Sequence, residues 1–193
     1  MPYGGQGDGD DNALVARCRA GDTGAFEQLF ERHHAKIFGL AVRILRDRES
    51  ALDAVQETLI RAYRSLDRYT GEGSFGGWLT RITANLAVDG VRSRHRVERV
   101  ESEVESAQLT EIPSSAGRPD QAAEAEELRR ALDKAMDRLP TTQRVVLVLK
   151  EIEGLSCEEI AGALRCSVGT VMSRLHHARR KLQRRLRPWG EAL

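Results

Sequence analysis

The sequence predicts an all-α protein made of two small helical domains that are joined by a flexible acidic linker. Apolar residues recur at intervals of three and four along most of the chain, which is the period of amphipathic helices. No segment shows the alternation that is typical of a strand. Residues 97–119 have no sustained period and are acidic and Ser-rich, so we interpret them as the linker.

The first domain is predicted to span residues 13–96, after a disordered tail over residues 1–12 that is rich in Gly and Asp. A short helix near Leu14–Ala20 is broken by Gly21, and a longer helix then runs to about Leu45. The apolar residues at helical spacing on this longer helix are Phe26, Leu29, Phe30, Ile37, Leu40, Ala41 and Ile44.

Two more helices complete the first domain. Asp47 has the residue type of an N-cap for a third helix. A Gly-rich loop over residues 69–74 follows, and Ser74 or its neighbour starts a fourth helix that reaches about Arg94. The predicted core residues are Val55, Leu59, Ala62 and Leu66 on the third helix, and Phe75, Leu79, Ile82 and Leu86 on the fourth.

The second domain is predicted over residues 120–187. Asp120 can cap a helix that ends before Pro140, and a buried helix rich in Val and Leu follows over residues 141–152. Gly154 ends that helix. The residues of the first of these helices that are expected to face inward are Leu128, Leu132, Ala135 and Leu139.

The end of the second domain has the pattern of a helix-turn-helix, which places one helix in the major groove of DNA. Ser156 and Glu159 can form a capping box for a short helix. After a tight turn, Ser167 caps a longer helix, which stops before Pro188 and a tail over residues 188–193.

Residues 165–187 carry eight basic residues and no Asp or Glu, which suits a nucleic-acid surface. An apolar stripe on the long helix leaves Ser, His and Arg on the other side, and arginine suits guanine. The alternative is a solvated surface helix, which the preceding capped helix and turn disfavour. The residues predicted to contact duplex DNA are Ser167, Thr170, Met172, Ser173, Arg174, His176, His177, Arg179 and Arg180.

A second line of polar residues follows the fourth helix. An aromatic ring, an amide and several arginines in line suit single-stranded nucleic acid, because bases stack on the ring and arginines hold the backbone. A boundary tryptophan beside solvated arginines is an equally good interpretation of this pattern, and the acidic Asp89 favours it. The line consists of Trp78, Arg81, Asn85, Asp89, Arg92 and Arg96.

The third helix places Asp53, Gln56 and Glu57 on its outward side. Asp53 and Glu57 lie one turn apart, so they could pair with basic residues of a partner. Outward acidic residues on a helix most often serve solvation, and the pattern alone does not decide between the two.

The composition narrows the classes of function. The net charge of +1 does not indicate a bulk polyanion binder, and the absence of an apolar run of membrane-spanning or signal-peptide type predicts a cytoplasmic protein. Nothing in the chain implies a cofactor. A zinc site built from Cys157, Cys166, His176 and His177 matches no usual ligand spacing, so no metal is expected.

Motifs along nearly the whole chain, from about residue 14 to residue 186, resemble bacterial sigma factors of the extracytoplasmic-function class. The resemblance is specific because the motifs occur in the family's order with a linker between them. The matching segments are Asp53-Ala54-Val55-Gln56-Glu57-Thr58, Gly73-Ser74-Phe75-Gly76-Gly77-Trp78-Leu79, Arg81-Ile82, Asn85-Leu86-Ala87, Leu139-Pro140, Gly154-Leu155-Ser156, Glu159-Ile160-Ala161 and Gly169-Thr170-Val171-Met172-Ser173-Arg174.

This resemblance implies a non-enzymatic, monomeric transcription initiation factor of the nucleoid. Asp53, Gln56 and Glu57 would contact the clamp helices of the largest subunit of core RNA polymerase. The helix-turn-helix would read the −35 promoter element, the linker would thread toward the RNA exit path, and an anti-sigma protein is a further candidate partner. The residues implied in −10 recognition and strand opening are Tyr69, Gly73, Ser74, Phe75, Trp78, Arg81, Asn85 and Arg92.

The chain departs from the family pattern at two places. Met172 stands where the family often has Arg or Lys, and His176-His177 is also atypical, so the −35 sequence cannot be copied from relatives. The paired Gly76-Gly77 is unusual because glycine weakens a helix start by up to about 1 kcal/mol per residue.

Two other classes of function compete with a sigma factor. A dimeric helix-turn-helix regulator would bind palindromic sites, but the linker and the segment 53–57 argue against it. A helical enzyme would use His33, His34 and Glu31, but adjacent histidines on a helix point about 100° apart and suit one site poorly.

Overall fold

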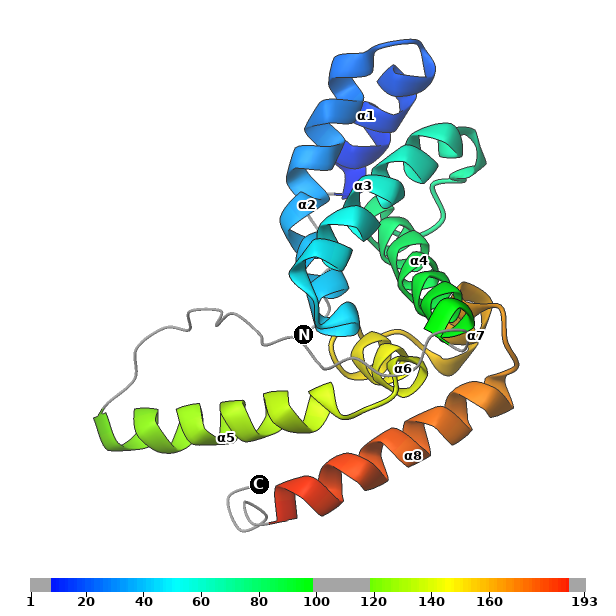
Figure 1. Ribbon diagram of the computed structural model, residues 1–193. Coiled ribbons are helices and arrows are strands. Elements are labelled where there is room, and N and C mark those ends of the chain that lie inside the picture. The colour runs from blue at the N-terminus through cyan, green and yellow to red at the C-terminus, as the bar shows by residue number, and fades with distance from the viewer. Residues whose placement is uncertain (1–7, 99–118, 188–193) are drawn as a thin grey trace. The chain divides into compact units, whose positions relative to one another are not determined.

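The computed structural model describes residues 8–98 and 119–187, and the chain divides into two compact units after Glu101. All regular elements in this described part are helices, which confirms the all-α fold class (Figure 1). The predicted linker over residues 97–119 lies outside the described residues except at its two ends, and the predicted tail over residues 188–193 lies outside them entirely.

The first unit begins with α1, which already starts at Asp8. The prediction of a disordered tail through residue 12 is therefore wrong for its last five residues. The cause is tertiary: the carboxylate of Asp11 is only 2% exposed and is bound by Arg32 and His33. The elements of this unit are α1 (Asp8–Arg19), α2 (Thr23–Leu45), α3 (Arg48–Arg64), the 3-10 turn η1 (Leu66–Arg68) and α4 (Phe75–Glu98).

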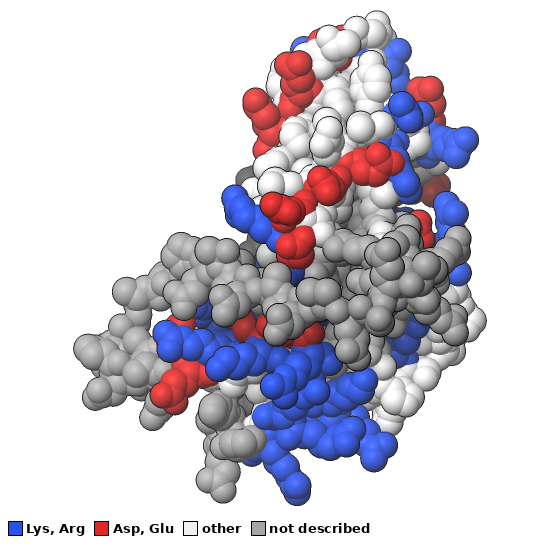
Figure 2. All heavy atoms as spheres, in the orientation of Figure 1, with Lys and Arg blue, Asp and Glu red and all other residues white. Residues whose placement is uncertain are grey.

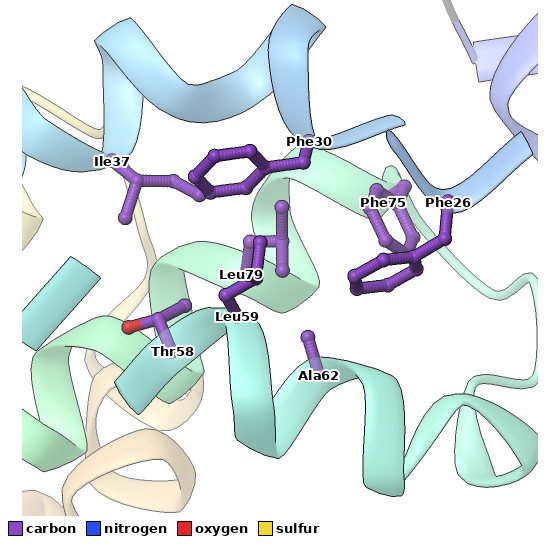
Figure 3. A pocket seen from close by; sticks show the side chains of 8 residues that line it. All are labelled: Phe26, Phe30, Ile37, Thr58, Leu59, Ala62, Phe75 and Leu79. Atoms are coloured by element: carbon purple, nitrogen blue, oxygen red, sulfur yellow. The ribbon is translucent and has the colours of Figure 1, made fainter. Parts of the chain in front are cut away.

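Helices α2, α3 and α4 pack on one another and enclose the core of the first unit (Figure 1). Their apolar side chains converge, as Figure 3 shows for Phe26, Phe30 and Ile37 of α2, Leu59 and Ala62 of α3, and Phe75 and Leu79 of α4. The free space among them is about 10 Å³, which is room for one water molecule at most. This space is a small packing gap and not a ligand site.

Side-chain caps start the helices of the first unit. Asp47 accepts from the N–H of Ser50 at 2.8 Å, which confirms the cap predicted for α3. Asp22 caps α2 by accepting from the N–H of Ala25 at 3.2 Å. The hydrogen bond from Arg17 is the main reason why the pKa of Asp22 is lowered.

The second unit is built around α6, whose residues 145–149 are all buried against α7 and α8. Helix α5 runs alongside α8 (Figure 1). Ala135 and Leu139 face inward as predicted, but Leu132 is 42% exposed, because α5 buries only a narrow stripe. The elements are α5 (Pro119–Asp137), α6 (Thr141–Glu151), α7 (Cys157–Leu164) and α8 (Val168–Leu186). None of the described helices of the chain combines the length and apolarity that a membrane crossing requires.

Candidate nucleic-acid interface

Helices α7 and α8 form the predicted helix-turn-helix, and local hydrogen bonds fix each part of it. Ser156 accepts from the N–H of Glu159 at 3.1 Å, and the Glu159 carboxylate accepts from the N–H of Ser156 at 2.8 Å. The turn passes through Arg165 in the left-handed conformation, with φ of 48°. Ser167 then starts α8 by accepting from the N–H of Thr170 at 3.1 Å.

The two sides of α8 differ sharply in exposure. Val171, Leu175 and Ala178 are at most 4% exposed and fix the helix to the second unit. Figure 2 shows basic side chains gathered over this part of the molecule. A face of hydroxyl, imidazole and guanidinium groups can contact phosphates and base edges. The exposed residues of this face are Met172, Ser173, His176, His177, Arg179 and Arg180, while Thr170 and Arg174 are half-buried.

An open groove of about 590 Å³ runs beside the exposed face of α8. Lys150 of α6 and Cys157 of α7 line its other side. Beside it, Glu151 of α6 accepts from Nη2 of Arg179 at 2.5 Å. Both side chains are about half exposed, so water screens this ion pair and a phosphate can compete for the guanidinium. On α8 the groove is lined by Met172, Leu175, His176, Arg179, Arg180 and Gln183.

The orientation of His177 determines which atom it offers to a partner. Its Nδ1 lies 2.7 Å from the carbonyl oxygen of Ser173, and a carbonyl can only accept, so Nδ1 carries the hydrogen. In the uncharged ring Nε2 is then an acceptor, which suits an amino group on adenine or cytosine. The plane of the His176 ring is nearly perpendicular to that of His177, and the two ring centroids lie 5.7 Å apart.

The loop before α4 is organised by buried aromatic rings. Tyr69 and Phe75 are only 4% and 1% exposed, so they shape this loop and offer no surface to a base in this conformation. Their ring centroids lie 5.4 Å apart, and the ring of Trp78 lies 5.5 Å from each. Gly73 has φ of +79°, a conformation that glycine adopts without strain.

Helix α4 begins at this loop and carries the predicted line of strand-contacting residues. Ser74 accepts from the N–H of Gly77 at 3.0 Å, which fixes the helix start. Trp78, Arg81 and Asn85 are all half-buried. Nδ2 of Asn85 donates to the carbonyl oxygen of Arg81 at 3.1 Å, which leaves its Oδ1 for a base edge. The buried Nε of Arg81 has no hydrogen-bond partner among the described residues. Arg92 lies on the same helix, but its side chain is outside the described ones.

The structure explains the two glycines at the start of α4. A Cβ on Gly76 would lie 3.1 Å from the ring of His33, and a Cβ on Gly77 would lie 3.0 Å from Oγ of Ser74. The helix therefore approaches α2 and its own cap so closely that a Cβ at either glycine would push its neighbour away by a few tenths of an ångström.

The predicted polymerase contacts lie together on the outer side of α3. Asp53 and Gln56 are exposed, and Glu57 is partly exposed. Glu57 accepts from Nε of Arg61 at 2.7 Å, an exposed pair one turn apart. The carboxylate of Asp53 is therefore the more available anion on this surface.

The histidines of α2 do not form a common site. Nε2 of His33 lies 2.7 Å from Oδ2 of Asp11. His34 instead packs against the rings of Phe30 and Phe38, with centroids 5.0 and 6.3 Å away. Within the described ranges, no group of three or more His, Cys, Asp or Glu residues is arranged to hold a metal ion.

Residues that sequence analysis missed surround the loop. Asp11, Asn12 and Arg19 of α1 contact the loop or the residues that support it. Asp11 and Asn12 fall in a segment that is rich in Gly and Asp, and this composition gives no sequence sign of the helix that forms there. The apolar pair Leu14-Val15 that follows was the only available sign that this segment packs.

Both units match described protein families. Residues 29–97 match Sigma-70 region 2, and residues 129–182 match Sigma-70, region 4. The chain is 37% identical over 186 residues to the RNA polymerase sigma-H factor of Pseudomonas aeruginosa, covering 92% of this chain and 94% of the relative. It is 35% identical over 186 residues to the ECF RNA polymerase sigma-E factor of Escherichia coli, covering 92% and 95%.

Two solved structures are similar over most of the chain. The sigma factor RpoE in complex with the anti-sigma factor NepR, from Bartonella quintana, aligns with a TM-score of 0.63 at 26% identity, covering 84% of this chain and 96% of that one. CnrH in complex with the cytosolic domain of CnrY aligns with a TM-score of 0.57 at 28% identity, covering 92% and 97%.

Proposed function

This chain belongs to the sigma-70 family of RNA polymerase sigma factors, in the extracytoplasmic-function class, and we propose how its two units divide the work of that family. A sigma factor recognises promoters and directs RNA polymerase to initiate transcription there. The polymerase carries out the chemistry, so the chain acts by binding and is not an enzyme.

The second unit, assigned to residues 120–187, reads the −35 element as duplex DNA. The observation that carries this assignment is the exposed polar face of α8 opposite its buried stripe. We assign base readout to Arg174 and His176, and phosphate contacts to Arg179, Arg180 and the start of α8 at Ser167. Because Met172 is 59% exposed at the centre of this face, an apolar contact such as a thymine methyl group is expected beside it.

The first unit, helices α1 to α4, holds the separated strand of the −10 element. A flipped base enters at the loop over residues 69–75, and the strand follows Trp78, Asn85 and Arg92 along α4. Opening the duplex costs about 1.4 kcal/mol per base-pair step, while stacking one base on an aromatic ring returns about 1–3 kcal/mol. A few captured bases therefore offset much of the cost of opening.

The outer face of α3 binds core polymerase. Asp53, Gln56 and Glu57 pair with the clamp helices of the largest subunit. Arg61 has to release Glu57 for this pairing, and the cost is small because their ion pair is exposed.

An anti-sigma protein is a further partner that we propose for this chain. RpoE and CnrH were both solved in complexes whose partners are NepR, an anti-sigma factor, and the cytosolic domain of CnrY. Leu52 and Tyr63 of the first unit are 46% and 54% exposed and give such a partner apolar surface. The chain is monomeric when free and acts in the cytoplasm, at the nucleoid.

Run-off transcription with purified core polymerase and mapped start sites tests this function. Added chain should produce new start sites, and Arg174→Ala or His176→Ala should redistribute them among promoters with different −35 elements. Unchanged start-site choice in both variants would remove these residues from the reading face. If the wild-type chain produced no new start site, the assigned function would be wrong.

A further inference from the structure

We propose that α1 is a brace that fixes the shape of the loop over residues 69–75, with Asn12 and Arg19 as positioning residues for recognition of the separated strand. The proposal rests on the −10 function assigned to this loop above. It adds a role for a helix that supports this loop from the α1 side and carries none of the residues assigned to strand or polymerase binding.

The first anchor joins α1 to the middle of the loop. The hydroxyl of Tyr69 shares its one hydrogen between two acceptors, Oδ1 of Asn12 at 3.1 Å and the carbonyl oxygen of Gly73 at 3.0 Å. The ring of Tyr69 is buried, so this hydroxyl cannot turn to water without moving the ring cluster. Through the Tyr69 hydroxyl, Asn12 therefore links α1 to Gly73, one of the two loop glycines, with Gly71, whose backbone has a positive φ.

The second anchor joins α1 to the start of the loop. Nη2 of Arg19 donates to the carbonyl oxygens of Leu66, at 2.9 Å, and of Tyr69. Leu66 starts the 3-10 turn η1, and Tyr69 follows its end. One guanidinium thus holds both ends of this turn, with bonds strengthened by its charge.

The third anchor supports the far end of the loop. The buried carboxylate of Asp11 holds the ring of His33 at 2.7 Å from Nε2. The other side of this ring lies 3.1 Å from the position of a Cβ on Gly76, and its centroid is 5.5 Å from that of Phe75. His33 is therefore a spacer between α1 and the first turn of α4.

Together the three anchors contact the start, the middle and the end of the loop from one helix. A loop that already has its bound shape loses less conformational entropy when a base enters, so binding is tighter. The expected consequence is that loosening α1 impairs capture of the strand without affecting polymerase binding or −35 recognition, because those functions are assigned to residues of α3 and of the second unit.

Full-length variants in complex with core polymerase test this role. Asn12→Ala and Arg19→Ala each remove one anchor, and Tyr69→Phe removes the hydroxyl while keeping the ring. Arg17→Ala is the matched control, since Arg17 lies on the same helix and pairs with Asp22 at the start of α2, at 2.7 Å. Each variant is measured for core affinity, for permanganate reactivity of the opened −10 region, and for opening on promoters substituted at the flipped base.

We expect open-complex formation to fall about fivefold to tenfold for Asn12→Ala and Tyr69→Phe, the effect of one lost hydrogen bond, and further for Arg19→Ala, which loses two charge-assisted bonds. The preference for the native over the substituted −10 base should decrease in the same variants. Their affinity for core polymerase should stay unchanged, and Arg17→Ala should behave like the wild-type chain. Opening and base discrimination equal to the control in both Asn12→Ala and Tyr69→Phe would overturn the proposal. A parallel loss of core affinity would also overturn it, because α1 would then be a general structural support. Failure of the wild-type chain to open any promoter would instead refute the underlying function.

Discussion

Replacing Gly76 by alanine tests the close approach of α4 to α2. The new Cβ would lie 3.1 Å from two atoms of the His33 ring, and that ring cannot retreat because buried Asp11 holds its Nε2 at 2.7 Å. Overpacking of this kind costs about 1–3 kcal/mol, against a gain of up to about 1 kcal/mol from better helix propensity. With the full propensity gain subtracted, we expect a net loss of up to about 2 kcal/mol.

Gly90→Ala is the control for this substitution. Gly90 lies on the same helix, and nothing lies within 4 Å of its Cβ position, so the propensity gain should appear alone. Thermal unfolding followed by Trp78 fluorescence, in a Trp189→Phe background, reports on the first unit. For a domain of this size about 1 kcal/mol shifts Tm by about 4–8 °C, so Gly76→Ala should lower Tm and Gly90→Ala should raise it.

Asp11→Ala provides a second test, because it frees the His33 ring to move. The cost of Gly76→Ala should then shrink, which gives a coupling free energy of about 0.5–3 kcal/mol between these two positions, because both contact His33. The reasoning is refuted if Gly76→Ala stabilises the protein as much as Gly90→Ala, or if its cost is the same with and without Asp11.

Three further outcomes follow from the proposed surfaces. Asp53→Ala combined with Glu57→Ala should weaken the binding of core polymerase about tenfold or more and leave Tm unchanged. The control is Glu27→Ala, which replaces an exposed acidic residue on α2 and should change neither quantity. Equal core affinity in all variants would exclude this face of α3. Trp78→Leu should slow promoter opening by about 5-fold to 150-fold, the effect of one lost stacked base, and affect the initial binding of the promoter far less. Permanganate kinetics measures the opening step and a filter-binding assay measures the binding step. Equal losses in both steps would contradict the stacking role. His176→Ala should change the ranking of −35 sequences in competition binding by the polymerase complex by about 1 kcal/mol or more at the contacted base, and an unchanged ranking would remove His176 from base readout.

Local features of the fold could be predicted because their cause lies within a few residues. The caps at Asp47, Ser156 and Ser167 each form a bond to a backbone N–H three residues ahead, so sequence spacing is enough to find them. The buried stripe of α8 likewise follows from helical period alone.

Features that depend on distant partners could not be predicted. Asp11 looks like a disordered-tail residue until its partners on α2, 21 and 22 residues away, are known. Tyr69 and Phe75 look like strand-contacting residues in a polar loop, and only the packing of α4 on α2 and α3 shows that they are buried. The exposure of Leu132 depends in the same way on how much of α5 its neighbours cover.

In the proposed function the second unit binds duplex DNA, the first unit binds a separated strand, and both act together only on the polymerase. The most direct measurement places 2-aminopurine in the non-template strand of the −10 element and follows its fluorescence. We expect a large increase in this fluorescence when the chain and core polymerase are both present, and little or no increase with either alone. No increase with both present, or an equal increase with the chain alone, would contradict it.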